Sequence, residues 1–237
     1  MIYQSIILAA GSSRNSNSDY RKCSFLVDGK RTLLEYSLSA FTSAQKTVAA
    51  LNSIDYEKFN GYSFYGSPIL VNIARPTQGA LATSGMCLDF MTDDIPIVIS
   101  AVDGICIGIM EDFLKRMSET DADGGAVIFP SVNLNYSYVR INHGFPIEFA
   151  EKIRIGEVAT AGIFFFKNKA LLMESILWAI LNQVKHKDIY YLSSAMNKFI
   201  FEGKKVVLFE TTEDNYFRFS TEEEATDSRE RLKENFG

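Results

Sequence analysis

The sequence predicts an α/β protein with a mixed, mainly parallel central sheet flanked by helices. Three observations indicate this class. Apolar strand-like segments and amphipathic helix-like segments alternate through the first half of the chain, which is the pattern of βα units. The segment IPIVISAV at 95–102 is almost entirely apolar, as expected of a strand covered by helices on both faces. The chain of 237 residues shows no linker, repeat or low-complexity tract, which predicts one domain over 1–237.

Strands and helices are expected to alternate from the first residues onward. Frequent β-branched residues predict a strand over 2–8, and Gly, Ser, Asn and Asp predict a loop over 9–22. A helix should begin near Thr32, because Thr32 and Glu35 match a capping box. The elements that follow are strands over 47–51 and 67–74, a helix over 78–92, the strand over 95–102 and a helix around 109–119.

The second half of the chain is expected to contribute further strands before it ends in helices. In GIFFF, alternate side chains point to opposite sides, so this strand should be buried on both faces. The helix over 169–184 is strongly apolar and predicts either core or the surface of a homodimer. The expected strands are 124–130, 136–142, 146–153, 159–168 and 204–211, and the expected helices are 169–184, 189–203 and a charged one over 221–236.

Composition argues against several classes of partner. The formal charge is −5 and no run of five basic residues occurs, so nucleic acid is not expected as a partner. The longest apolar runs are too short to span a bilayer, and the first residues lack the basic start of a signal peptide, so no membrane partner is expected. Three widely spaced cysteines predict a reduced, cytoplasmic compartment without a disulfide framework or a zinc site.

The loop after the first strand has a composition that suits a triphosphate. Gly11 would let backbone amides approach a ligand, and the hydroxyls of Ser12 and Ser13 can donate hydrogen bonds. Arg14 and Lys22 would neutralise phosphate oxygens. An ordinary polar loop between a strand and a helix explains the same composition equally well.

A carboxylate ends the apolar strand over 95–102. Burying Asp103 there is costly without a partner, and Mg²⁺ is a natural one, because it usually takes one or two carboxylates together with substrate phosphate oxygens. The alternative is that Asp103 and Gly104 form a turn. Ligands of parallel sheets bind beyond the carboxyl ends of the strands, so Gly11 and Asp103 are expected to open into one crevice.

Two further segments carry polar groups whose simplest explanation is structural. In RPTQGALATSG, Gly79 would allow close backbone approach and Gln78 could bind a nucleobase edge, but taken alone an ordinary helix start explains the segment better. In PIEFAEKI, Glu151 and Lys152 by themselves predict an exposed charge pair on an edge strand.

The order of these and other short segments is more informative than any one of them. In this order they resemble the sugar-phosphate nucleotidyltransferase (NDP-sugar pyrophosphorylase-like) family, which has a GT-A-like α/β fold, over about residues 3–225. The matching residues are Leu8-Ala9-Ala10-Gly11, Arg14, Lys22, Gly29-Lys30, Leu34-Glu35-Tyr36-Ser37-Leu38, Gly79–Ala82, Val98–Asp103, Ser137-Tyr138-Val139, Glu151-Lys152, Ala159–Phe166 and 190–206.

The resemblance implies an Mg²⁺-dependent transfer from an NTP (CTP, UTP or dTTP) to a small phosphorylated acceptor such as a sugar phosphate. The acceptor's phosphate oxygen would attack the α-phosphate and pyrophosphate would leave, in the service of a bacterial capsule or lipopolysaccharide. Catalysis would fall to Arg14, Lys22, Asp103 and Lys152, with Asp103 on the metal. The nucleotide would contact Ala10, Gly11, Ser12, Ser13, Gln78, Gly79 and Ala80, and the acceptor Glu151, Thr160 and Arg218.

Three departures from the family pattern bear on activity. Arg14 comes three residues after Gly11, one fewer than in the family, and RKC replaces the usual PK pair at Lys22. Arg218 stands near the position where some members carry a second metal-binding aspartate, and Asp214 is not expected to replace it. A guanidinium could serve there as a fixed cation, or catalysis could be lost.

Three alternatives stay open. The first is a cytidylyltransferase for a phosphorylated alcohol, an amino acid derivative or a phosphonate, which the short chain favours. The second is a catalytically inactive subunit that binds a nucleotide-sugar and regulates an active partner. The third is a glycosyltransferase, which the absence of a DxD triplet at AVDGI disfavours.

Overall fold

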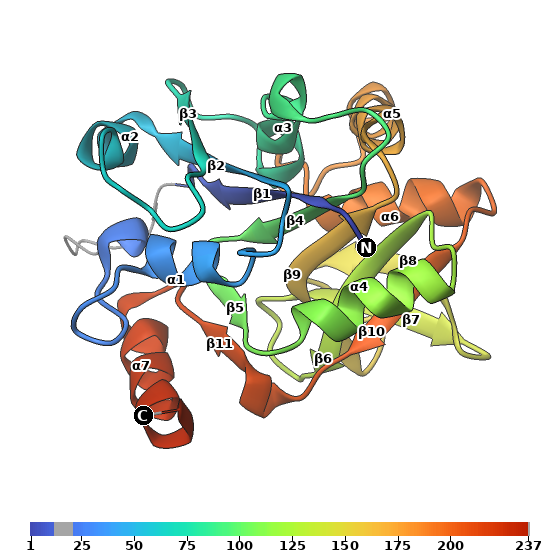
Figure 1. Cartoon of the computed structure of the whole chain (residues 1–237). Coiled ribbons are helices and arrows are strands. Elements are labelled where there is room, and N and C mark those ends of the chain that lie inside the picture. The colour runs from blue at the N-terminus through green and yellow to red at the C-terminus, as the bar shows by residue number, and fades with distance from the viewer. Residues whose placement is uncertain (12–20, 237) are drawn as a thin grey trace.

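The structure is a computed structural model that describes residues 1–11 and 21–236, with side chains up to residue 234. In these residues, nine strands form one sheet and two short strands form another. Helices lie on both sides of the large sheet (Figure 1). The predicted class, a mixed and mainly parallel α/β sheet, is confirmed. Within the described part of the chain, no helix combines the length and the apolarity that a membrane span would need.

The first half of the chain builds the parallel part of the sheet in the order β3-β2-β1-β4. All three pairings are parallel, so the carboxyl ends of the four strands lie at one edge. The strands are β1 (Gln4–Ala9), β2 (Lys46–Asn52), β3 (Ile69–Ile73) and β4 (Ile97–Ala101), and the helices of this half are α1 (Leu33–Ser39), α2 (Ser53–Phe59), α3 (Ala80–Gly85) and α4 (Met110–Glu119).

The second half adds antiparallel strands on the other side of β4. The long strand β9 (Val158–Phe166) lies antiparallel between β4 and β6 (Gly124–Pro130), and β10 (Val206–Glu210) pairs in parallel with β6. The remaining strands are β7 (Ser137–Asn142), β8 (Phe145–Glu151), β5 (Gly104–Cys106) and β11 (Tyr216–Arg218), and the remaining helices are α5 (Lys169–Leu181), α6 (Leu192–Phe201) and α7 (Glu222–Phe236).

Each face of the sheet carries its own hydrophobic core. Along β9, Ile163 and Phe165 pack into one core while Phe164 and Phe166 pack into the other, which confirms a strand buried on both faces. Helices α1, α4 and α7 contribute to the first core, and α3, α5 and α6 to the second. In Figure 1 these two sets of helices lie below and above the sheet.

Helix α5 is apolar on its outer side as well. Leu172 and Ile176 face the core, whereas Leu177 and Leu181 are 51% and 79% exposed. The core interpretation of this helix is therefore confirmed for its inner side, and the homodimer surface stays a prediction.

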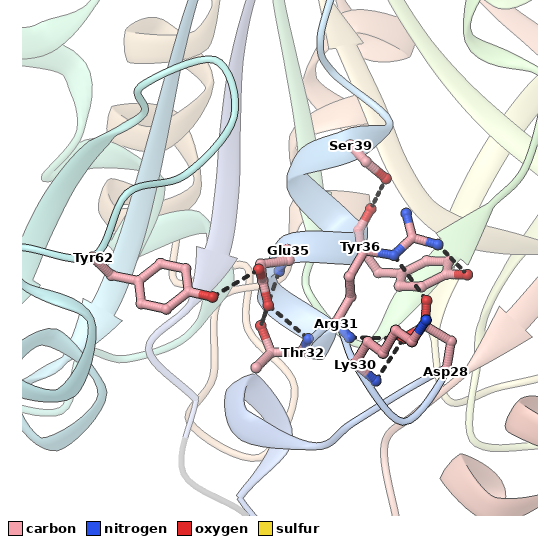
Figure 2. A network of polar contacts seen from close by, with 8 residues as sticks. All are labelled: Asp28, Lys30, Arg31, Thr32, Glu35, Tyr36, Ser39 and Tyr62. Carbon is pink, nitrogen blue, oxygen red and sulfur yellow. Dashed lines mark hydrogen bonds and ion pairs between the residues drawn. The ribbon is translucent and has the colours of Figure 1, made fainter.

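Hydrogen bonds and an ion pair hold the start of helix α1. The predicted capping box is present: the side chain of Thr32 accepts from Glu35 N–H, and the backbone N–H of Thr32 donates to Glu35 at 2.8 Å. Figure 2 shows Tyr62 reaching the same carboxylate from a neighbouring loop, with its hydroxyl 3.0 Å from Glu35 Oε1. In the turn before the helix, Asp28 accepts from the Arg31 guanidinium at 2.8 Å. The first turn of helix α1 is therefore hydrogen-bonded to the loop that carries Tyr62, and the turn before the helix has its own ion pair.

Several element boundaries differ from those predicted. The helix expected over 78–92 ends at Gly85 and is followed by a 3-10 turn at Leu88–Phe90. The helix expected over 189–203 begins at Leu192, since Tyr191 adopts an extended backbone. Helix α2, which was not predicted, starts where the Asn52 side chain accepts from the backbone N–H of Asp55. Short elements of this kind depend on a single cap and leave little periodic pattern in the sequence.

Candidate functional site

The first strand and the Asp103 strand end side by side. Leu8 of β1 is paired with Ala101 of β4, and Val102 N–H donates to Leu8 C=O at 3.1 Å. Gly11 and Asp103 follow these pairs at the same edge of the sheet. Gly11 is exposed, and a Cβ added to it would meet no atom of the described residues within 4 Å. The structure therefore places Gly11 and Asp103 at a shared edge, as the strand pattern predicted.

Asp103 forms an ion pair with the lysine that follows the first loop. Lys22 Nζ lies 2.5 Å from Asp103 Oδ2, and it also donates to Ser220 Oγ at 3.4 Å. Burial alone would raise the pKa of Asp103, but the charge of Lys22 and then that of Arg218 lower it below its ordinary value. Asp103 is thus held as a carboxylate between cations.

Residues from the end of the chain complete this side of the site. β11 pairs antiparallel with β5, so Arg218 lies opposite Gly104, and Phe219 N–H donates to Asp103 C=O at 2.9 Å. The Arg218 guanidinium lies over the ring of Tyr136 with Cζ 4.4 Å from its centroid. The pairing of two distant short strands thus brings Arg218 beside Asp103.

The acceptor-side residues predicted from the sequence fall into two environments. Glu151 ends β8 and accepts hydrogen bonds from Ser137 and, at 3.4 Å, from Ser193. Burial raises the pKa of Glu151, although these hydrogen bonds and the nearby cations Lys152 and Arg218 oppose the shift. The interpretation of this segment as an exposed charge pair therefore holds for Lys152 but not for Glu151.

Lys152 and Thr160 differ sharply in exposure. Lys152 is exposed, has a left-handed backbone with φ 55°, and carries its ammonium 5.9 Å from the ring centroid of Tyr191. Thr160 lies inside β9 opposite Ile128 and is only 5% exposed. Lys152 is therefore open to a ligand, whereas Thr160 is covered by the protein.

Both backbone conformation and packing require glycine at position 79. Its φ is 114°, and a Cβ there would lie 2.5 Å from Ile189 Cγ2 and 2.6 Å from Tyr190 C=O oxygen. The backbone of Tyr190 also binds this turn, because Tyr190 N–H donates to Gln78 C=O at 2.7 Å. The Gln78 side chain is exposed, and Ala80, which begins α3, is partly exposed. This turn follows β3, so it lies at the same edge of the sheet as Gly11.

The side chains at this edge offer few ligands for a metal ion. The described residues contain no group of three His, Cys, Asp or Glu side chains that could hold one. Asp103 offers one carboxylate, and Lys22 already contacts one of its oxygens. Mg²⁺ is commonly bound through one or two carboxylates, with waters and substrate phosphates completing its shell. Asp103 therefore fits Mg²⁺ that arrives with a polyphosphate and does not fit an ion resident in the free protein.

Three predicted site residues lie outside the described part of the chain, and two residues at the site were not predicted. Ser12, Ser13 and Arg14 lie outside the described residues, whereas Ala10 lies beside Gly11 and is partly exposed. Sequence reasoning missed Tyr136 and Glu224, which contact the Arg218 guanidinium. The one sequence signal for Tyr136 is its place directly before the Ser137-Tyr138-Val139 segment.

Solved structures resemble this chain along its whole length. A nucleoside-diphosphate-sugar pyrophosphorylase from Vibrio cholerae RC9 is 16% identical with a TM-score of 0.77, over 96% of this chain and 99% of that one. The inositol-1-phosphate CTP transferase from T. maritima is 14% identical with a TM-score of 0.74, over 100% and 98%. A Bacillus anthracis protein assigned as a glucose-1-phosphate thymidylyltransferase, crystallised with sucrose, is 14% identical with a TM-score of 0.79, over 99% and 97%.

Sequence comparison adds no closer relative. No family model matches the chain, and no curated protein matches it. At identities of 14% to 16% the likeness to the solved structures concerns the fold. The chain has the nucleotidyltransferase-like α/β fold of these proteins.

Proposed function

We propose that this chain is a nucleotidyltransferase that moves a nucleoside monophosphate from an NTP to a small phosphorylated acceptor and releases pyrophosphate. One observation carries the proposal: Gly11 and the Lys22–Asp103 pair lie together at the carboxyl ends of the neighbouring strands β1 and β4. In an open α/β sheet this edge is where ligands bind. The fold shared with solved enzymes of this reaction type supports the same assignment.

The ion pair gives Lys22 and Asp103 two states. In the free protein each neutralises the other across 2.5 Å. With an NTP bound, Lys22 would pair with the phosphate oxygens, and Asp103 would then be free to hold the Mg²⁺ that accompanies the nucleotide. Bound Mg²⁺ neutralises phosphate charge as it develops during the displacement. The exposed backbone at Ala10 and Gly11 contacts the triphosphate, together with Ser12, Ser13 and Arg14.

The other residues surround the base and the acceptor. Gln78, Gly79 and Ala80 face the base, and the shape of their turn is set by Tyr190. Lys152 reaches the acceptor's phosphate. Glu151 accepts from hydroxyl groups of the acceptor, while Thr160 supports the strand below them. Most of the rate enhancement then comes from alignment and charge stabilisation, because the acceptor's own phosphate oxygen is the nucleophile.

The nucleotide is a pyrimidine nucleoside triphosphate (CTP, UTP or dTTP), and the acceptor is a sugar phosphate or a similar small molecule. We place the product in capsule or lipopolysaccharide synthesis in the cytoplasm. The direct experiment incubates the protein with Mg²⁺, each NTP in turn and a panel of sugar phosphates and phosphorylated alcohols, and measures released pyrophosphate. One NTP–acceptor pair should give turnover. Silence across the panel would contradict an active enzyme.

A glycine variant separates a role in binding from a role in folding. Gly11→Ala adds a Cβ that meets no atom within 4 Å in the described part of the chain, and Gly11 has no left-handed φ. The melting temperature should therefore stay unchanged, while the affinity for Mg²⁺–NTP falls by about tenfold, or ~1.4 kcal/mol, because the Cβ blocks the backbone. Unchanged affinity would remove Gly11 from the nucleotide site.

Two other functions make distinct predictions. A cytidylyltransferase for a small acceptor would release pyrophosphate from CTP alone. Chain length does not favour this function over the first one, because the pyrophosphorylase structure also matches over nearly the full length of both chains. An inactive binding subunit is favoured by the cation Arg218 beside Asp103. It would bind a nucleotide or nucleotide-sugar without turnover and form a stable complex with an active enzyme.

A further inference from the structure

Arg218 is held in a fixed position by two residues of α7 and by Tyr136. Its backbone N–H donates to Ser228 Oγ at 3.0 Å, and Ser228 Oγ donates back to its C=O at 2.7 Å. Its guanidinium lies over Tyr136, and Nε is 3.3 Å from Glu224 Oε2. Glu224 is itself fixed by the backbone N–H groups of Ser220 and Thr221, both at 3.2 Å. The guanidinium is therefore oriented before any ligand binds.

One end of this guanidinium is left without a partner. Nη1 of Arg218 is buried and makes no hydrogen bond to any described residue. A buried polar group in this state loses the free energy that water would have given it, about 1–3 kcal/mol, and calls for a bound group that completes it. The side chain as a whole is 19% exposed, so a ligand can approach the guanidinium, and it reaches Nη1 itself once the groups that cover this atom shift.

The position of Arg218 joins the two halves of the proposed site. On one side it neighbours Asp103 through the β5–β11 pairing, since Arg218 lies opposite Gly104. On the other side its guanidinium lies over Tyr136, whose C=O accepts from Lys152 N–H at 3.0 Å. The neighbour of Tyr136, Ser137, donates to Glu151. A group bound to Nη1 would therefore lie between the proposed metal carboxylate and the proposed acceptor residues.

We propose that Arg218 binds the phosphate of the acceptor and holds its attacking oxygen toward the nucleotide. This inference rests on the proposed function. A guanidinium binds phosphate through two parallel N–H bonds, and a rigid one loses little entropy in doing so. Lys152, which is exposed and directly follows Glu151, supplies the second cation.

The test compares steady-state constants in Arg218→Lys and Arg218→Gln. Loss of a charge-assisted hydrogen bond predicts that KM for the phosphorylated acceptor rises about 10- to 100-fold in Arg218→Gln, and less in Arg218→Lys. The dissociation constant for Mg²⁺–NTP should change less than about twofold. The matched control is Arg231→Lys, because Arg231 also lies over an aromatic ring, Phe217, but donates to Glu213 C=O outside the site.

The unmodified protein offers a second measurement that does not depend on a variant folding. If glycerol phosphate is not itself turned over, it should inhibit by competing with the acceptor and not with the NTP. Its inhibition constant should rise in Arg218→Lys. If the variants weaken NTP binding and leave the acceptor's KM unchanged, Arg218 contacts the nucleotide and the inference is wrong. If the wild type binds no NTP and releases no pyrophosphate, the proposed function itself fails.

Discussion

Lys22 and Asp103 show how one contact can serve both the free and the bound protein. Two opposite charges that are partly withdrawn from water stabilise each other, and leaving either alone is costly. A polyphosphate with Mg²⁺ can take over both roles at once. The pair therefore gives each charge a partner when no ion is bound.

Asp103→Asn should remove catalysis while the fold persists. The amide keeps the shape of the side chain but no longer binds Mg²⁺, so pyrophosphate release should fall by about 100-fold or more, which corresponds to ~3 kcal/mol of transition-state stabilisation. Asp93→Asn is the matched control, because Asp93 also forms an ion pair with a lysine, 3.1 Å from Lys169 Nζ, but its side chain is exposed and is not part of the proposed site. Turnover that survives in Asp103→Asn would exclude Asp103 from the reaction.

Glu151 should make the free energy of unfolding fall as the pH rises, whereas an ordinary paired carboxylate makes it rise. Burial raises its pKa in the folded state, so its contribution to stability is fully present below the unfolded pKa near 4.3 and is lost as the pH rises through the folded pKa. Urea unfolding of wild type and Glu151→Gln from pH 4 to pH 8 measures this. The wild-type free energy of unfolding, relative to the variant, should fall with rising pH; a difference that rises would contradict the burial of this carboxyl.

At the scale of elements, short-range signals in the sequence were reliable and long-range pairings were not. The Thr32–Glu35 cap formed as predicted because its partners are three residues apart. The pairing of β5 with β11 was not predicted, since each strand has only three residues and neither shows a periodic pattern. The contacts of Arg218 with Tyr136 and Glu224 depend on that pairing, so they were also out of reach of sequence reasoning.

The turn before α3 provides a stability test at this scale. Gly79→Ala should lower the free energy of unfolding by about 1–3 kcal/mol more than Gly108→Ala, because φ 114° and ψ −178° at Gly79 form a conformation that essentially only glycine adopts and its Cβ would overlap Tyr190 and Ile189. Gly108→Ala is the control, since Gly108 has φ 73° and no atom near its Cβ position. Equal losses in the two variants, measured by urea unfolding, would contradict the requirement for glycine in this turn.

For the whole molecule, the sequence predicted the class of fold and the edge that carries the site. Alternating elements and the apolar strand before Asp103 were sufficient for that, because parallel strands end at a common edge. The antiparallel insertion of β9 between β4 and β6 was not predicted, because pattern and propensity do not encode which strands become neighbours. Residues 12–20, which include Arg14, are not described, so their predicted roles stay predictions.

The two cores share one sheet, and this predicts cooperative unfolding. Strands β1, β4 and β9 contribute side chains to both cores, so neither core can open alone. Urea unfolding followed by far-UV circular dichroism and by the fluorescence of the single tryptophan, Trp178 on α5, should give one midpoint. Two separated midpoints would contradict the prediction that residues 1–237 form one domain.

The most direct measurement of the central claim is the binding of CTP, UTP and dTTP to the wild type and to Asp103→Asn, with Mg²⁺ and with EDTA, by calorimetry. We expect that at least one nucleotide binds the wild type with Mg²⁺, and that EDTA and the variant each weaken this binding. If no nucleotide binds, or if binding is indifferent to both Mg²⁺ and Asp103, the edge formed by β1 and β4 is not a Mg²⁺–NTP site.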